Sequence, residues 1–64
     1  MKIPVDRYNA ALLAYYQTDR QLRVGQYLMN ELIPAVKDSE LFYMVNHKLA
    51  IELFTVKYVE GYDA

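Results

Sequence analysis

The side chains that could do metal chemistry in this 64-residue chain are few and scattered. His47 is the single histidine, Glu52 follows five residues later, and the chain contains no cysteine. A metal site needs several His, Cys or carboxylate ligands that converge at ligand spacing. We therefore expect no metal site, and we interpret His47 as an exposed histidine in the first turn of a helix.

Catalytic side chains are equally sparse. The hydroxyl-bearing residues Thr18, Ser39 and Thr55 have no base near them in the sequence. Only two glycines are present, far apart, which excludes a Gly-rich phosphate-binding loop. Asp38 and Glu40 are typical of acids at the start of a helix, and we expect a pocket of about 300 Å³ to be hard to enclose with short helices. The sequence therefore predicts that the protein is not an enzyme and needs no cofactor.

One polar face remains as a candidate binding surface. Its members are polar or aromatic and recur at helical spacing, namely Arg20, Arg23, Gln26, Tyr27 and Asn30. Arg and Tyr dominate protein–protein interfaces, whereas Arg, Gln and Asn also read base edges in DNA. A net charge of −1 weighs against nucleic acid. A plain solvated helix face is the interpretation without function. As a function we predict a protein-binding face, and a helix-turn-helix-like nucleic-acid-binding regulator or a structural subunit of a larger assembly is the alternative.

Tyrosine is unusually frequent, with seven residues against two Phe and no Trp. Its ring buries apolar area while its hydroxyl seeks water or a partner, so tyrosine is enriched at interfaces. We expect Tyr8, Tyr15 and Tyr58 to line the edge of the core. At least one of Tyr15 and Tyr16 should lie at the rim, because adjacent residues point about 100° apart on a helix.

A second patch is predicted around Tyr43. It belongs to the run Leu41–Val45, five apolar residues in succession. No single helical stripe can bury all of them, so some should enter the core and others should stay available to a partner. Tyr43 and Met44 are the expected exposed members of the run, and Tyr27 is expected to be exposed as well.

The residues from Arg23 to Asn30 carry a family resemblance. With Arg23-Val24-Gly25-Gln26, Asn30, Glu40-Leu41-Phe42-Tyr43 and Ala50, the chain resembles small uncharacterised accessory proteins of bacteriophages and prophages over about residues 20 to 54. These share an Arg-x-Gly-Gln-x-x-x-Asn stretch, an acidic residue with Leu-Phe-Tyr, and a final amphipathic helix. The resemblance implies an accessory protein that acts on a host factor in the host cytoplasm, and it brings no catalytic residues.

The first two elements that position these residues are predicted helices. Apolar residues at i, i+3, i+4, i+7 and i+8 from Tyr8, with Pro4 ahead of them, predict a helix over 5–17. Thr18 followed by Gln21 has the pattern of a capping box, which predicts a second helix over about 19–33. Pro34 should end it. Gly25 costs about 1 kcal/mol inside that helix, which the close approach of a neighbouring helix would offset.

The third stretch admits two interpretations. The spacing of 3, 4, 4 and 3 in Phe42, Val45, Leu49, Leu53 and Val56 fits one continuous helix over 39–60. Alternatively, a short helical turn near 40–44 precedes a separate helix over 46–60, capped by Asn46. The broken form is favoured. Gly61 would then take the left-handed position that commonly follows a helix.

Together these elements predict an all-α protein, a compact three-helix bundle in one domain over 1–64. Burying the apolar area of a chain this long contributes roughly 100 kcal/mol, against about 96 kcal/mol of lost conformational entropy. Since the two terms nearly cancel, we expect association to add stability, most simply as a homodimer. No stretch approaches the roughly 20 apolar residues of a membrane span, and we expect a soluble cytoplasmic protein without a membrane partner.

Overall fold

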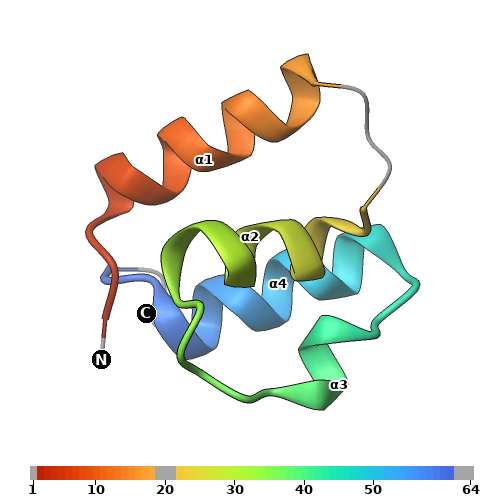
Figure 1. Cartoon of the computed structure of the whole chain (residues 1–64). Helices are drawn as coiled ribbons and strands as arrows, with labels where there is room; N and C mark the ends of the chain where they lie inside the picture. Colours follow the sequence, from red (N-terminus) through yellow and green to blue (C-terminus); the bar gives the residue numbers. More distant parts are fainter. Residues whose placement is uncertain (1, 19–21, 62–64) are drawn as a thin grey trace.

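Four α-helices make up the computed structural model, which describes residues 2–18 and 22–61 (Figure 1). In chain order they are α1 (Val5–Gln17), α2 (Val24–Leu32), α3 (Ser39–Phe42) and α4 (His47–Tyr58). The predicted all-α class is confirmed. The predicted bundle of three helices becomes four, because the helical turn expected near 40–44 forms a short helix of its own.

The first helix occupies the predicted residues. Pro4 stands immediately before it with φ −57°, an angle already suited to a helix start. Tyr8 and Tyr15 form its buried positions. Both lie deeper than the core edge expected for them, since they are 2% and 6% exposed.

The second helix begins later than predicted, at Val24. The Thr18 hydroxyl donates to the Tyr15 carbonyl at 3.0 Å, at the end of α1, and does not cap α2. The Tyr15 hydroxyl in turn donates to the Leu22 carbonyl at 2.9 Å, which ties Leu22, just ahead of α2, to α1. The predicted helix over 19–33 is wrong at its start, because Leu22 and Arg23 are not helical and α2 begins at Val24. Residue 19 and Gln21, the second member of the predicted capping box, lie outside the described residues.

The end of α2 and its glycine agree with the sequence. The helix stops at Leu32, two residues before Pro34. An ideal Cβ on Gly25 would lie 2.5 Å from the Leu41 carbonyl oxygen of α3. Gly25 thus allows the close helix approach that was predicted to offset its cost.

The broken interpretation of the third stretch is confirmed, and the continuous helix over 39–60 is wrong. The Asp38 side chain accepts from the Leu41 N–H at 3.1 Å and caps α3. The Asn46 side chain accepts from the Leu49 N–H at 3.0 Å and caps α4. Two separate caps fix two separate helix starts.

The fourth helix turns a different side to the core than the spacing suggested. Its buried residues are Ala50, Phe54 and Thr55, and the Phe54 ring stacks against Tyr8 of α1 at 6.0 Å. The apolar stripe that predicted the continuous helix mostly faces outward, with Val45 78%, Leu49 51% and Val56 53% exposed. We call these three residues the outer stripe of α4, with Val45 lying just before the helix and Leu49 and Val56 within it.

The two ends of the described chain meet beside α4 (Figure 1). Ile3 and Val59 form an isolated parallel bridge. The Ile3 N–H donates to the Tyr58 carbonyl at 2.6 Å, and the Glu60 N–H donates to the Ile3 carbonyl at 2.8 Å. Gly61 has the predicted left-handed backbone, with φ +88°. The predicted helix end at 60 is wrong, since α4 ends at Tyr58 and the bridge to Ile3 holds Val59 extended. A single bridge has no alternating pattern, so periodicity gave no sign of it.

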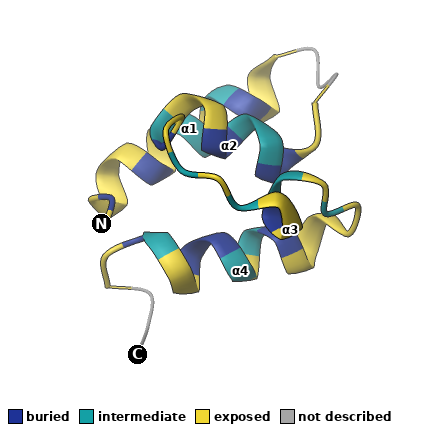
Figure 2. Ribbon diagram, turned by 60° about the horizontal axis from the view of Figure 1, so that its bottom comes forward, coloured by how far each residue is buried: buried dark blue, intermediate teal, exposed yellow. Residues whose placement is uncertain are grey.

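One hydrophobic cluster joins all four helices and the bridge (Figure 2). Its buried members are Ile3, Tyr8, Tyr15, Val24, Leu28, Met29, Ile33, Leu41, Ala50, Phe54 and Val59. α2 supplies the centre, because it packs against α1, α3 and α4.

Candidate functional site

The predicted polar face lies on the side of α2 that the core leaves free. Arg23 precedes the helix and is exposed, Asn30 is exposed near its end, and Gln26 and Tyr27 are half-buried between them. Arg20 lies outside the described residues. The remaining four residues stand on one side of α2 by their spacing, and we call them the α2 face.

Tyr27 of this face also belongs to an aromatic cluster at one end of the molecule. Its ring lies 5.2 Å from Tyr15, and Tyr15 lies 5.5 Å from Tyr16. The Tyr16 hydroxyl is 2.6 Å from Nε2 of His47, at the first residue of α4. Tyr15, Tyr16, Tyr27 and His47 thus link α1, α2 and α4. His47 is exposed in a first helical turn, as predicted, and Tyr27 is less exposed than predicted.

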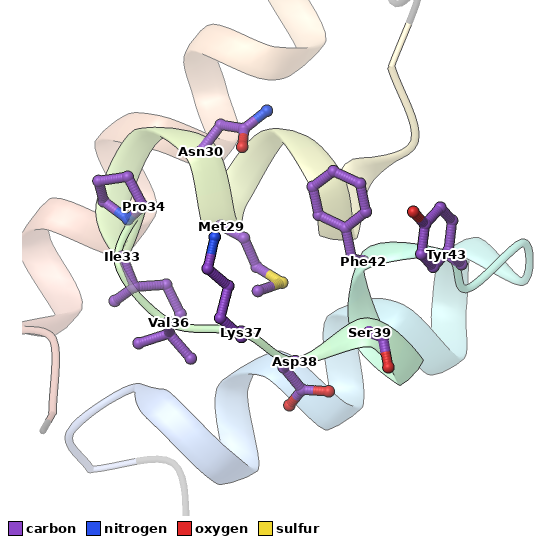
Figure 3. A pocket seen from close by; sticks show the side chains of 10 residues that line it. All are labelled: Met29, Asn30, Ile33, Pro34, Val36, Lys37, Asp38, Ser39, Phe42 and Tyr43. Carbon is purple, nitrogen blue, oxygen red and sulfur yellow. The ribbon is translucent and has the colours of Figure 1, made fainter.

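A hollow of about 460 Å³ opens between the end of α2, the 33–38 connection and α3 (Figure 3). Apolar, aromatic and polar side chains line it, namely Met29, Asn30, Ile33, Pro34, Val36, Lys37, Asp38, Ser39, Phe42 and Tyr43. The hollow exceeds the roughly 300 Å³ that short helices were expected to enclose with difficulty, but it is open to solvent rather than enclosed. The long connection after Pro34 holds α3 away from the end of α2 and leaves this space.

Two of the predicted binding residues line this hollow. Asn30 lines it from α2 and Tyr43 from the end of α3. Tyr43 is 65% exposed and packs edge-on against Phe42 at 5.1 Å. In the run Leu41–Val45, Leu41 is buried while Tyr43 is exposed, as predicted, whereas Met44 is half-buried. The α2 face and the patch around Tyr43 therefore adjoin through Asn30.

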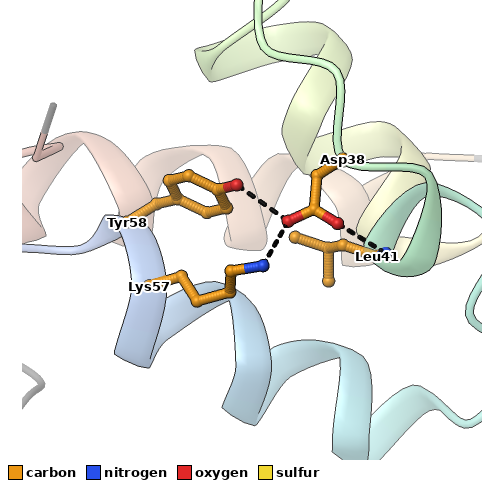
Figure 4. Close-up of polar contacts among 4 residues, drawn as sticks. All are labelled: Asp38, Leu41, Lys57 and Tyr58. Carbon is orange, nitrogen blue, oxygen red and sulfur yellow. Dashed lines mark hydrogen bonds and ion pairs between the residues drawn. The ribbon is translucent and has the colours of Figure 1, made fainter.

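Asp38 connects the wall of the hollow to α4 (Figure 4). Its Oδ2 accepts from Lys57 Nζ at 2.6 Å and from the Tyr58 hydroxyl at 2.8 Å, while Oδ1 caps α3. These hydrogen bonds, led by that from Lys57, lower the pKa of Asp38. Burial, followed by the bond to Asp38, raises the pKa of Tyr58. The carboxylate is therefore fully engaged within the protein.

Sequence reasoning missed several residues of this site. Pro34, Lys37 and Phe42 were not proposed as binding residues, and Asp38 was interpreted only as a cap. The sequence offered one sign of this site, the stretch 34–39, which begins with the helix-stopping proline and carries two opposite charges. The partners of Asp38 lie 19 and 20 residues away along the chain, a separation that no local pattern reveals.

The described residues contain neither a metal-binding cluster nor a membrane-spanning helix. Within residues 2–18 and 22–61, no three His, Cys, Asp or Glu side chains gather in a way that would hold a metal ion. None of the helices described has both the length and the apolar character needed to cross a membrane. Comparison with protein-family models, curated proteins and solved structures finds no match to this chain.

Proposed function

We propose that this chain is a small non-enzymatic protein-binding module, an accessory protein of the phage type that binds and modulates a host protein in the host cytoplasm. The observation that carries the proposal is the α2 face, which adjoins the hollow at Asn30. An Arg, amides and tyrosines on rigid helices next to a concave surface match the composition of protein interfaces.

A protein partner suits this face better than nucleic acid does. Residues 24–32 contain one Glu and no Lys or Arg, so Arg23 is the described cation of the face. Nucleic-acid binding depends on neutralising several phosphates and weakens steeply as salt rises. A regulator that binds nucleic acid is the second candidate, and retention on heparin or duplex DNA at low salt would favour it.

The test of the main proposal is affinity capture from host lysate with variants that spare the fold. Tyr27 is unsuitable because its ring packs against Tyr15. The variant Arg23→Glu/Gln26→Ala alters the α2 face while leaving the aromatic cluster intact. We expect it to lose the captured protein while its circular dichroism at 222 nm stays that of the wild type.

The matched control is Arg7→Glu/Gln17→Ala, which makes the same chemical changes at exposed positions of α1. It should capture the same protein as the wild type, as measured by mass spectrometry. Equal capture by the two double variants would refute the α2 face as the binding surface.

We also propose that the protein forms a homodimer through the outer stripe of α4. The stripe is apolar, and Lys48 and Glu52 beside it carry balancing charges, so a second copy meets no net like charge there. In a two-fold dimer the same patch of each copy faces its counterpart. An uncharged stripe can be paired in this way without electrostatic repulsion.

The dimer is tested by sedimentation velocity over a range of concentrations. Leu49→Lys should shift the population to monomer, because it places a charge in the stripe. Leu13→Lys is the control, since Leu13 is an equally exposed leucine, 58% against 51%, on α1. Identical sedimentation of both variants and the wild type would contradict a dimer at this stripe.

A further inference from the structure

The hollow offers apolar walls that remain accessible. Met29 and Ile33 are buried beneath it, whereas Pro34 and Tyr43 are exposed and Phe42 is half-buried. Figure 3 shows the rings of Phe42 and Tyr43 on the α3 side and Pro34 on the other, with Lys37 between them. A volume of about 460 Å³ falls within the range of roughly 300–1,000 Å³ that small ligands occupy.

Two charged side chains line the hollow, Lys37 and Asp38, and they differ in whether they can still pair with a ligand. The Asp38 carboxylate is already bonded to Lys57, Tyr58 and the Leu41 N–H. Lys37 is exposed and has no ion pair among residues 2–18 and 22–61. Asn30 adds an exposed amide at the α2 side. The lining thus offers the Lys37 ammonium, the Asn30 amide and the exposed hydroxyls of Ser39 and Tyr43, and each of these groups can donate to a carboxylate. Among the described residues that line the hollow, Lys37 is the cation.

We infer that the hollow binds a short linear segment of the partner protein that presents an apolar side chain next to a carboxylate. The apolar side chain contacts Phe42 and Tyr43 on the α3 side of the hollow, and the carboxylate accepts from Lys37 next to them. This inference rests on the proposed protein-binding function and specifies the chemistry of the partner.

The test uses the full chain labelled with ¹⁵N and three blocked peptides. Ac-Glu-Leu-Leu-NH₂ carries both features, Ac-Gln-Leu-Leu-NH₂ lacks the charge, and Ac-Glu-Ser-Ser-NH₂ lacks the apolar side chains. Amide chemical shifts in a titration should change over 29–43 with the first peptide. An exposed ion pair predicts about two- to fivefold tighter binding of the Glu peptide than of the Gln peptide.

Two pairs of variants assign the effect to the site. Lys37→Gln should remove the preference for the Glu peptide, while Lys48→Gln, at an exposed lysine of α4, should keep it. Tyr43→Ser should weaken both leucine peptides, while Leu13→Ser, at an exposed leucine of α1, should leave their binding unchanged. Equal binding of the Glu and Gln peptides, equal binding of the serine peptide, or shifts spread over the whole surface would overturn the inference.

Failure of this inference is distinguishable from failure of the proposed function. Capture that Arg23→Glu/Gln26→Ala abolishes, without peptide shifts over 29–43, overturns only the peptide site. Peptide shifts of the expected pattern, with capture unchanged by that variant, overturn only the α2 face.

Discussion

At the residue scale, Asp38 joins more parts of the molecule than its position suggests. One carboxylate caps α3 and ties it to the end of α4 through Lys57 and Tyr58. The side chain of Asp38 is 9% exposed and that of Lys57 is 39% exposed, so water screens the ion pair only in part. The hydrogen bonds stabilise the charged form of Asp38, which is why its pKa is lowered.

Asp38→Asn is expected to lower the free energy of unfolding at pH 7 by about 1 kcal/mol. A hydrogen bond between charged groups contributes more than this when buried, but the exposure of Lys57 weakens it. Because the folded-state pKa of Asp38 is lowered, its contribution is complete above the unfolded-state pKa of about 3.9 and is lost as pH falls through the folded pKa. Urea titrations between pH 2 and pH 7 should therefore show wild type and variant converging in acid. Glu60→Gln, at an exposed residue, is the control, and a difference independent of pH would contradict the role of the charge.

At the element scale, local signals predicted where helices begin and end better than they predicted which side of a helix faces the core. Pro4, Pro34 and Asn46 act on their own neighbours, and each marks a boundary correctly. The side of α4 that faces the core was missed because both of its sides carry apolar residues, so spacing alone cannot choose between Leu49 and Phe54. The start of α2 depends on the Tyr15 hydroxyl reaching Leu22, which is a tertiary contact.

The same distinction applies to the candidate site. Asn30 and Tyr43 were proposed from residue type and spacing, whereas the hollow that both line arises from an irregular connection that has no period. Lys37 gains its significance only from the engagement of Asp38 by Lys57. Which of two neighbouring charges is paired can be recognised only from the folded structure.

The crossing of α2 and α3 is testable at Gly25. Gly25→Ala would gain about 1 kcal/mol of helix propensity on an isolated helix, yet its Cβ would meet the Leu41 carbonyl oxygen at 2.5 Å. Overpacking of this kind typically costs about 1–3 kcal/mol, so we expect a net loss of stability in urea denaturation. Ala10→Gly, at an exposed site of α1, calibrates the propensity alone. A Gly25→Ala protein as stable as the wild type would show that α3 can move away at no cost.

At the scale of the whole molecule, the chain reaches ordinary compactness with very little interior. Its Cα radius of gyration is 10.7 Å, equal to the roughly 10.7 Å expected for a compact domain of this length. Its accessible surface of 4302 Å² is near the roughly 4,200 Å² expected from its mass. Among residues 2–18 and 22–61, a core of eleven buried apolar residues leaves a small margin of stability, which the proposed dimer would enlarge.

The bridge between the chain ends should therefore matter to the whole fold. Ile3→Ala removes a side chain that is 3% exposed, and such changes cost about 2–5 kcal/mol. We expect a large fall in the urea midpoint and faster hydrogen exchange of the Glu60 amide, which donates to Ile3. Val5→Ala, two residues further along and 38% exposed, should change little. Equal effects of the two variants would mean that docking the Ile3 side chain adds nothing to global stability.

The aromatic cluster supplies a built-in optical reporter. The chain has no Trp, so its near-ultraviolet circular dichroism comes from Tyr and Phe alone. Tyr15, Tyr16 and Tyr27 lie within 5.2–5.5 Å of a neighbouring ring, and fixed packing of this kind generates such a signal, which is lost when side chains become mobile. Tyr8 and Tyr58, which pack on Phe54 of α4, contribute to the same tyrosine band near 280 nm. Loss of that band would therefore report that the aromatic contacts joining α1, α2 and α4 have come apart.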